Sequence, residues 1–270
     1  MKRTLLVILA HPDDESFGLG GTIAKCAHEG VDVYLICATR GESGKITDPE
    51  IASDTPKGPL REAELNASCR VLGINPPIFL GYHDSGRLER SQHDNPDAFM
   101  NAADETVEAQ LLDHISHIRP QVMLTFDPHG IYGHIDHIKI HRAATAAFWS
   151  AGGVMQPAPK RLYYAAMGIE RMQALQDARD TSTLSALDPK VYGVSADSYA
   201  YLADVSAYAE QKEASVRAHK SQVGPNSSFA DFNRESDMWR DMFTHEELVL
   251  GGLRGSFPEM PVDDLFAGLD

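Results

Sequence analysis

The chain has 270 residues, 43% of them hydrophobic, and its 39 acidic side chains outnumber 24 basic ones, giving a formal net charge of −15. This length and apolar content suffice for one α/β domain with a full core over residues 1–270. The acidic balance argues against nucleic acid and anionic membranes as partners, because clustered cations bind those surfaces. A small neutral ligand remains compatible with it.

Cysteine usage and the N-terminus bear on the compartment. Cys26, Cys37 and Cys69 have no metal-binding or redox spacing, and an odd number of cysteines fits a reducing compartment. The apolar run that follows Met1-Lys2-Arg3 is too short for a signal peptide, and no stretch approaches the roughly 18 apolar residues of a spanning helix. We therefore expect a cytoplasmic protein without membrane insertion, whether monomer or homo-oligomer.

Short β-rich runs alternate with amphipathic segments, a pattern typical of a parallel sheet. Strands are expected at 5–9, 31–38, 77–81, 121–126 and 161–165, with an edge strand at 201–205. Helices are expected at 22–28, 59–72, 106–118, 138–149 and 207–221. The less regular segments are a polar loop at 43–58, a loop with helical fragments at 170–200 and a mixed helical tail at 222–270. This order predicts an α/β fold, a Rossmann-like and mostly parallel sheet with helices on both faces and an irregular C-terminal part.

A cluster of polar side chains follows the first strand. The stretch Ala10-His11-Pro12-Asp13-Asp14-Glu15 begins where Pro12 ends the strand, because proline cannot donate to a sheet ladder. Open α/β sheets bind their ligands at the carboxyl ends of their strands. The glycines at 18–21 suggest a dinucleotide loop, but they come after an acidic cluster that would repel a pyrophosphate. The cluster therefore indicates a different kind of site.

A second cluster, with His134, Asp136 and His137, follows the fourth predicted strand. Parallel strands end at one edge, so the two clusters can meet although they are about 120 residues apart. A catalytic zinc needs three nitrogen or oxygen ligands and an open position for water. His11 and Asp14 can face one centre, and the second cluster supplies at least one more ligand. Each of these residues alone would be read as a cap or a surface charge, but together they predict a metal site.

The two clusters also resemble a known family. Ala10–Glu15 together with Tyr132-Gly133-His134-Ile135-Asp136-His137 is similar to the LmbE/PIG-L-like zinc N-deacetylases. Supporting matches lie at 39–42, 61–64, 82–86 and 219–222, so the resemblance spans about 1–225. The Asp-Ser-Gly element at 84–86 is most similar to the branch that acts on GlcNAc-inositol and mycothiol-type substrates. That branch often has Met where this chain has Arg87.

The resemblance implies a role for each motif residue. His11, Asp14 and His137 would ligate the metal, and Asp13 would be the base that deprotonates the metal-bound water. Zn²⁺ is the expected metal, and Fe²⁺ would accept the same ligands. An acid–base pair beside a metal also predicts a bell-shaped pH–rate profile.

Three further roles concern charge that develops during the reaction. His134 would stabilise this charge or protonate the leaving amine, Asp136 would orient His134, and the Tyr132 hydroxyl would contact the amide carbonyl.

Substrate-binding candidates are Arg61, Asp84 and Arg40. Arg61 could instead pair with Glu64 along a helix, and Asp84 could cap a turn. His219 could pack at the rim of the site, and Glu15 has no assigned role.

The predicted function is metal-dependent removal of an N-acetyl group from an N-acetylglucosamine-type amino sugar or small glycoconjugate. One alternative uses the same site as an amidase of mycothiol-type thiol conjugates. Another is a non-catalytic sugar- or nucleotide-binding module, although this leaves Asp13 and His134 unexplained. A third is a hydrolase of a secondary-metabolite glycoside.

Overall fold

The centre of the protein is a seven-stranded sheet with the strand order β3-β2-β1-β4-β5-β7-β6. The structure is a computed structural model that describes residues 2–177, 184–227 and 234–269. The first five strands pair in parallel, whereas β7 runs antiparallel to both β5 and β6. The strands are β1 (Thr4–Leu9), β2 (Asp32–Thr39), β3 (Ile78–Tyr82), β4 (Val122–Phe126), β5 (Arg161–Ala165), β6 (Tyr199–Asp204) and β7 (His245–Leu253).

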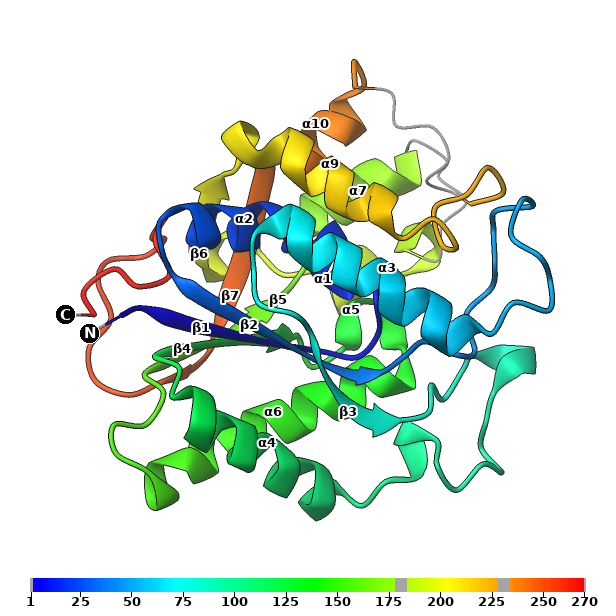
Figure 1. Cartoon of the computed structure of the whole chain (residues 1–270). Coiled ribbons are helices and arrows are strands. Elements are labelled where there is room, and N and C mark those ends of the chain that lie inside the picture. The colour runs from blue at the N-terminus through cyan, green and yellow to red at the C-terminus, as the bar shows by residue number, and fades with distance from the viewer. Residues whose placement is uncertain (1, 178–183, 228–233, 270) are drawn as a thin grey trace.

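Helices cover both faces of the sheet (Figure 1). One face carries α1 (Asp14–Phe17), α2 (Gly20–His28), α3 (Lys57–Leu72) and α9 (Ala209–Ala218). The opposite face carries α4 (Asp104–Ile118) and α6 (Ile135–Val154). The remaining α-helices of the described chain are α5 (Gly130–Gly133), α7 (Ile169–Asp177), α8 (Pro189–Tyr192) and α10 (Asp237–Thr244). The predicted α/β fold is thereby confirmed.

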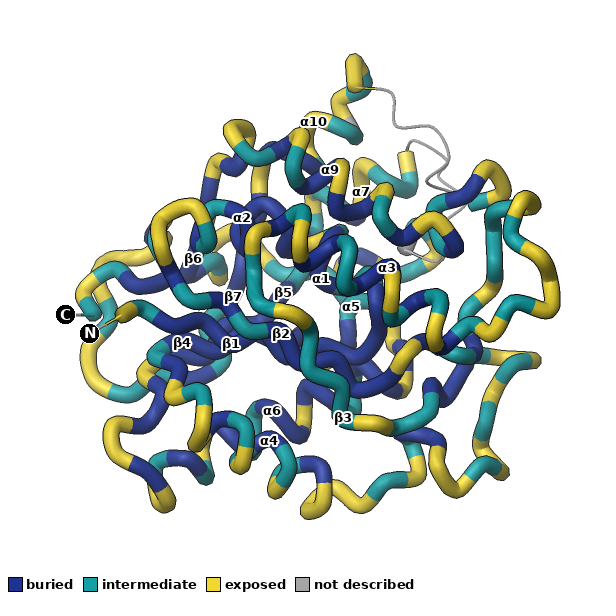
Figure 2. The backbone as a smooth tube through the Cα atoms, viewed as in Figure 1, coloured by how far each residue is buried: buried dark blue, intermediate teal, exposed yellow. Residues whose placement is uncertain are grey.

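The sequence pattern explains the core. Every residue of β1 is buried, as expected for a central parallel strand that has helices on both sides (Figure 2). On α4 the apolar residues Val107, Leu111 and Ile115 follow one another at four-residue spacing, and all three are fully buried. Burying each of them contributes about 1.5–3 kcal/mol, which anchors α4 to the sheet.

The C-terminal part differs from the prediction. The mixed helical tail expected at 222–270 contains α10 but also the nine-residue strand β7, which lies between β5 and β6. The prediction missed this strand because its first three residues, His245, Glu246 and Glu247, are polar. Both glutamates are nevertheless buried. Residues 228–233 and 270 of this segment, and 178–183 of the predicted loop at 170–200, lie outside the described residues.

Glu246 explains why a carboxylate is buried in β7. Its Oε1 and Oε2 accept hydrogen bonds from the Gly21 and Thr22 amides, at 2.9 and 2.7 Å, at the start of α2. Lys212 Nζ lies 2.7 Å from Oε1 and neutralises it. A Cβ on Gly21 would lie only 2.5 Å from a methyl carbon of Val205, so this close approach requires glycine. The helix start that resembled a dinucleotide loop thus binds an anion of the protein itself.

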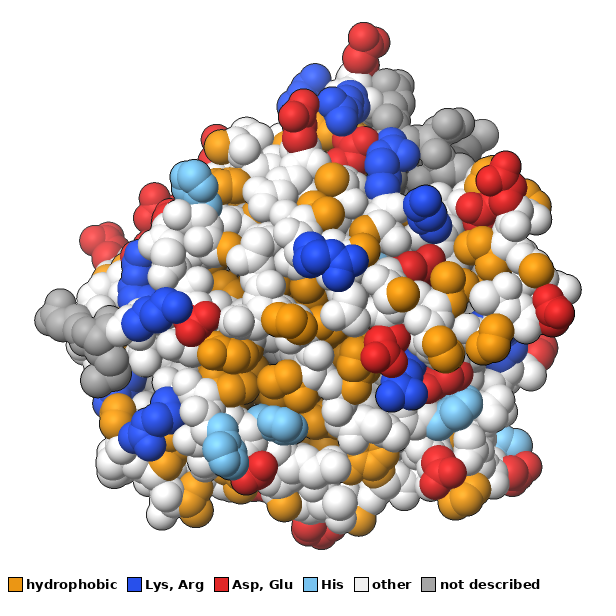
Figure 3. Space-filling model, viewed as in Figure 1, with side chains coloured by type: hydrophobic (Ala, Val, Ile, Leu, Met, Phe, Trp, Pro, Cys, Tyr) orange, Lys and Arg blue, Asp and Glu red, His pale blue; other side chains and the backbone are white. Residues whose placement is uncertain are grey.

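The sheet brings the two polar clusters together. Leu9 pairs with Cys37, Val7 with Leu124, and Thr39 with Tyr82, so β1 to β4 end at one edge. The segments that follow these strands therefore meet there. No helix in the described part of the chain is long and apolar enough to cross a bilayer. Basic and acidic side chains are interspersed on the face shown in Figure 3, without a broad basic patch.

Candidate metal centre and active site

The chain turns sharply after β1 and forms the first half of the site. Asp13 has φ 111° and ψ −26°, a conformation that costs a non-glycine residue about 1–3 kcal/mol. The turn lets the Asp14 carboxylate reach back, and its Oδ2 accepts a hydrogen bond of 2.7 Å from the His11 amide. Asp13 and Asp14 thus point to different places although they are neighbours in sequence.

His11, Asp14 and His137 converge on one point. His11 Nδ1 lies 3.1 Å from His137 Nε2, and Asp14 Oδ1 lies 3.3 Å from the same nitrogen. Asp14 Oδ2 is 3.7 Å from His11 Nδ1. Ligand atoms bonded to a tetrahedral zinc at about 2.0–2.1 Å lie about 3.3 Å apart, so the two ring nitrogens and the Asp14 carboxylate are spaced about as in a metal site. A ring nitrogen of His134 also lies within 4.8 Å of ring nitrogens of His11 and His137, so these three histidines are a second candidate ligand set.

The outer nitrogens of both rings contact acceptors. His11 Nε2 lies 3.1 Å from Asp136 Oδ2, and His137 Nδ1 lies 3.2 Å from the carbonyl oxygen of Gly130. Phe126 stacks on the His137 ring at 4.0 Å between centroids. An N–H directed outward leaves a lone pair on the inner nitrogen, which is the form that binds a metal.

The charges around the site suit a cation. Burial raises the pKa of Asp14, but His137 and His11 outweigh it and hold this pKa below its usual value. Burial also disfavours protonation of His11, yet the nearby carboxylates of Asp84, Asp136 and Asp14 raise its pKa. A buried group of carboxylates and imidazoles of this kind is stabilised by a positive charge at its centre.

Asp13 lies beside the three converging residues. Arg61 Nη2 donates to Asp13 Oδ2 at 3.0 Å, and the Asp13 amide donates to Glu15 Oε2, also at 3.0 Å. Burial raises the pKa of Asp13 to about 6, although Arg61 opposes the rise and Asp14 adds to it. A carboxylate with a pKa just below neutrality suits a general base at physiological pH.

His134 precedes α6 and caps it. Its Nδ1 accepts a hydrogen bond of 3.2 Å from the Asp136 amide, so the proton of the neutral ring is on Nε2. Burial, followed by the neighbouring rings of His11 and His137, lowers the pKa of His134 to about 3. His134 is thus a neutral N–H donor. Asp136 contacts His134 through its backbone amide, whereas its carboxylate contacts His11.

Tyr132 stands next to both histidines of the second cluster. Its ring centroid is 5.0 Å from that of His137 and 6.1 Å from that of His134. The guanidinium of Arg87 lies 5.1 Å over the Tyr132 ring. Burial raises the pKa of the Tyr132 hydroxyl, so it stays protonated as a hydrogen-bond donor.

The loop that presents Tyr132 is strained. Ile131 has φ 63° and ψ −56°, which is rare for a β-branched residue, and its amide donates to Asp127 Oδ1 at 2.7 Å. Gly130 has φ 60°, and a Cβ there would lie 2.6 Å from His137 Cβ. Only glycine lets the loop approach closely enough for its carbonyl to contact the His137 ring.

The substrate-binding candidates occupy different places. Asp84 faces the cluster, with Oδ1 3.5 Å from His11 Nε2. Arg61 is buried, and besides Asp13 it binds the carbonyl oxygens of Gly41 and Pro12. Its contacts with protein groups differ from the helix pair with Glu64 that was the alternative prediction.

The third candidate, Arg40, lies on the surface. Its side chain is half exposed and its Nε pairs with Glu62 at 3.0 Å. Of the three candidates, the structure therefore places only Asp84 in direct contact with a ring of the candidate metal ligands.

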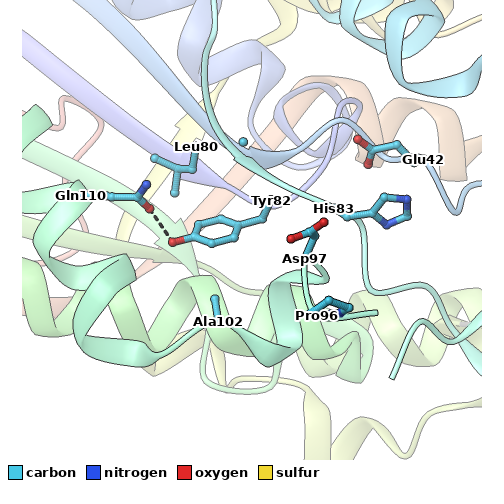
Figure 4. A pocket seen from close by; sticks show the side chains of 9 residues that line it. Glu42, Leu80, Tyr82, His83, Pro96, Asp97, Ala102 and Gln110 are labelled. Atoms are coloured by element: carbon cyan, nitrogen blue, oxygen red, sulfur yellow. Dashed lines mark hydrogen bonds between the residues drawn. The ribbon is translucent and has the colours of Figure 1, made fainter. Parts of the chain in front are cut away.

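A pocket of about 510 Å³ lies beside the carboxyl end of β3 (Figure 4). The Tyr82 hydroxyl donates to Gln110 Oε1 at 2.6 Å on one side, and Glu42, His83 and Asp97 line the other. Glu42 Oε2 also accepts a hydrogen bond of 3.1 Å from the backbone amide of Asp84. Glu42 therefore connects the pocket to Asp84, the candidate substrate-binding residue that faces the cluster.

Backbone groups also complete the site, and they were not predicted from the sequence. The Ser85 amide donates to Asp136 Oδ2 at 2.9 Å, and the Gly130 carbonyl contacts His137. The glycine at position 130 is the one residue type that could have indicated such a contact, because a backbone that approaches another group closely favours glycine.

Comparison with known proteins agrees with this geometry. A family model described as GlcNAc-PI de-N-acetylase, PIG-L, matches residues 6–148, which include both motifs. The chain belongs to the PIG-L family. A PIG-L relative from Acidothermus cellulolyticus, a 1D-myo-inositol 2-acetamido-2-deoxy-alpha-D-glucopyranoside deacetylase, is 36% identical over 100% of this chain and 96% of its own length.

Two further relatives extend the comparison. A deacetylase of the same name from Streptomyces griseus is 36% identical over 99% of this chain and 89% of its own. The crystal structure of a conserved protein from Thermus thermophilus is 25% identical, with a TM-score of 0.58 over 96% of this chain and 99% of that one. The PIG-L family model ends at residue 148, whereas these relatives align with nearly the whole chain.

Proposed function

We propose that this PIG-L protein is a zinc-dependent N-deacetylase whose substrate is an N-acetylglucosamine joined to inositol or a similar polyol. The observation that carries the proposal is the convergence of His11 Nδ1, His137 Nε2 and Asp14 within 3.1–3.7 Å of one another, with Asp13 beside them. The names of the two curated relatives support the substrate class.

The ligands in this proposal are His11, Asp14 and His137. Bound zinc supplies a water with a pKa near 7 and polarises the substrate carbonyl. Asp136 and the Gly130 carbonyl hold the two rings so that their inner nitrogens face the same point.

Asp13 moves the proton. Amide hydrolysis adds water oxygen to the carbonyl carbon, breaks the C–N bond and delivers a proton to the amine nitrogen. Asp13 accepts the proton from the attacking water and then returns it to the leaving amine, since a carboxyl group with a pKa of about 6 can do both near neutral pH.

His134 and Tyr132 stabilise the negative charge that forms on the carbonyl oxygen. His134 carries its proton on Nε2 and stays neutral, and Tyr132 keeps its hydroxyl proton. The low pKa of His134 favours this role over that of the acid that protonates the amine. Preorganised donors of this kind typically contribute about 100- to 1000-fold in rate each.

The test is acetate release from N-acetylglucosaminyl-inositol by zinc-loaded protein. Asp13→Ala and His11→Ala should each abolish turnover, and a chelator should do so reversibly. His117→Ala is the matched control, because His117 is exposed and bonds only within α4 among the described residues. Turnover that survives the chelator and both substitutions would refute the proposal.

The same assay separates the alternatives. An amidase of thiol conjugates would release a cysteine-derived fragment from a mycothiol-type conjugate faster than acetate from the amino sugar, which mass spectrometry distinguishes. A non-catalytic module would bind the sugar without metal and release neither product.

A further inference from the structure

Asp13 is held in place by a buried polar network that the proposed mechanism leaves unused. We infer that Glu15 and His219 are positioning residues for Asp13, and that His219 acts through the Glu15 carboxylate. The inference rests on the proposed role of Asp13 as the base. It assigns a task to the segment around His219, which lies more than two hundred residues from Asp13 in sequence.

Glu15 contacts the backbone of Asp13. Asp13 has φ 111°, so its peptide needs a partner that favours this turn over a regular one. Glu15 Oε2 provides it by accepting the Asp13 amide proton at 3.0 Å. Arg61 holds the carboxylate of the same residue at 3.0 Å. Backbone and side chain of Asp13 are therefore held by two separate side chains.

Three side-chain donors orient Glu15 in turn. This side chain is fully buried, and its Oε1 accepts from Ser16 Oγ at 2.6 Å, from Ser68 Oγ at 2.5 Å and from His219 Nε2 at 2.6 Å. The Oγ of Ser215 lies 2.5 Å from that of Ser16 and 2.8 Å from that of Ser68. Donors from α1 and α3 and from the end of α9 thus converge on one carboxylate oxygen.

His219 differs from its neighbours in the carboxylate that it contacts. His219 is completely buried and directly follows α9, so its ring has little freedom. Of the donors to Glu15 Oε1, it is the one with an ionisable ring, and Glu15 is its closest charged partner. Ser221 lies two residues further and is equally buried, but its amide and hydroxyl bind Glu64, each at 2.7 Å. Neighbouring positions therefore serve different carboxylates.

These contacts separate positioning from metal binding. Glu15 and His219 contact none of the three metal-ligand side chains through a hydrogen bond of the described structure. Removing the His219 donor should let Glu15 and the Asp13 turn relax while the ligands stay in place. A displacement of about 1 Å in a catalytic group lowers turnover by about 100-fold.

The experiment compares three variants of the full-length zinc-loaded protein on N-acetylglucosaminyl-inositol. His219→Leu removes the donor, His219→Gln keeps an N–H near the position of Nε2, and Ser221→Ala is the matched control in the same segment. We expect His219→Leu to lower kcat at least about tenfold, with KM and zinc content unchanged. His219→Gln should retain most of the activity, and Ser221→Ala should resemble the wild type.

Three results would overturn the inference. The first is a kcat for His219→Leu no lower than that of Ser221→Ala. The second is a parallel loss of zinc and kcat, which would place the effect on the ligands. The third is a His219→Gln variant as impaired as His219→Leu. Ser68→Ala tests the same network with a smaller change if His219→Leu does not fold, and a wild-type-like kcat would then count against the inference. An inactive wild-type protein would instead refute the proposed function.

Discussion

Substitution of Asp136 tests how the proposed site would hold zinc. Asp136 is fully buried, and its Oδ2 accepts hydrogen bonds from both the Ser85 amide at 2.9 Å and His11 Nε2 at 3.1 Å. Its Oδ1 has no hydrogen-bond partner among the described residues. Asp136→Asn can therefore keep both bonds through its amide oxygen and lose only the charge. Asp136→Ala loses the bonds as well, and the His11 ring is no longer oriented.

The magnitude follows from what each variant removes. Loss of a residue that orients a metal-binding histidine lowers metal affinity by about 10- to 100-fold, or about 1.4–2.7 kcal/mol. We expect Asp136→Ala near the upper end of this range and Asp136→Asn near the lower end. The order of the two variants is the informative result, because it separates the charge on the carboxylate from the orientation of the ring.

The assay is competition for zinc against a chromophoric chelator at fixed pH and ionic strength. Glu213→Gln is the matched control, since Glu213 is also a buried carboxylate but binds Arg217 and Arg234 away from the site. Zinc binding by Asp136→Ala within about twofold of the wild type would contradict this role of Asp136. Weaker zinc binding by Asp136→Asn than by Asp136→Ala would contradict it as well.

Other predictions concern pH and stability. Turnover should fall as the pH drops through about 6, where Asp13 takes up its proton, and Arg61→Gln should move this limb to higher pH because a cation that lowers this pKa is lost. The stability that His219 contributes over His219→Gln should be fully present below pH 6.5, since folding raises its pKa, and should diminish as the pH rises above that value. Lys212→Met should lower the free energy of unfolding by about 3–5 kcal/mol, because it leaves Glu246 buried without its cation.

Each of these predictions can be measured directly. A pH–rate profile that is flat over about pH 5–9, or an acidic limb that Arg61→Gln moves to lower pH, would contradict the role of Asp13. Urea unfolding across the same pH range measures the stability that His219 contributes, and a stability advantage of the wild type that grows above pH 6.5 would contradict the prediction. A free energy of unfolding of Lys212→Met within about 1 kcal/mol of that of the wild type would contradict the role of Lys212.

The alternation of strands and helices made the parallel part of the sheet predictable, and with it the meeting of the two polar clusters. His11 and His134 could be assigned to one edge because strand ends in a parallel sheet lie together. The partners of individual side chains could not be predicted in this way. The pairing of Arg61 with Asp13 depends on how α3 packs over the turn after β1, and no local pattern encodes this packing.

The contacts of Asp136 and the strand β7 could not be predicted either, because both depend on tertiary contacts. Asp136 contacts His11 through its carboxylate and His134 through its amide, a distinction that residue types alone do not contain. The strand β7 opens with two buried carboxylates. Lys212 and the start of α2 neutralise Glu246, and Arg171 pairs with Glu247. Rules that assign charge to the surface miss such a strand.

The place of β7 in the sheet has a consequence for synthesis of the protein. Among the described strands, β6 has β7 as its only neighbour, so it cannot join the sheet until the ribosome has released residues 245–253. The same strand brings Glu246 to the start of α2, which follows the first half of the site. A product of premature termination before β7 would expose an unpaired strand edge and uncapped amides, features that favour aggregation and degradation over a partly active enzyme.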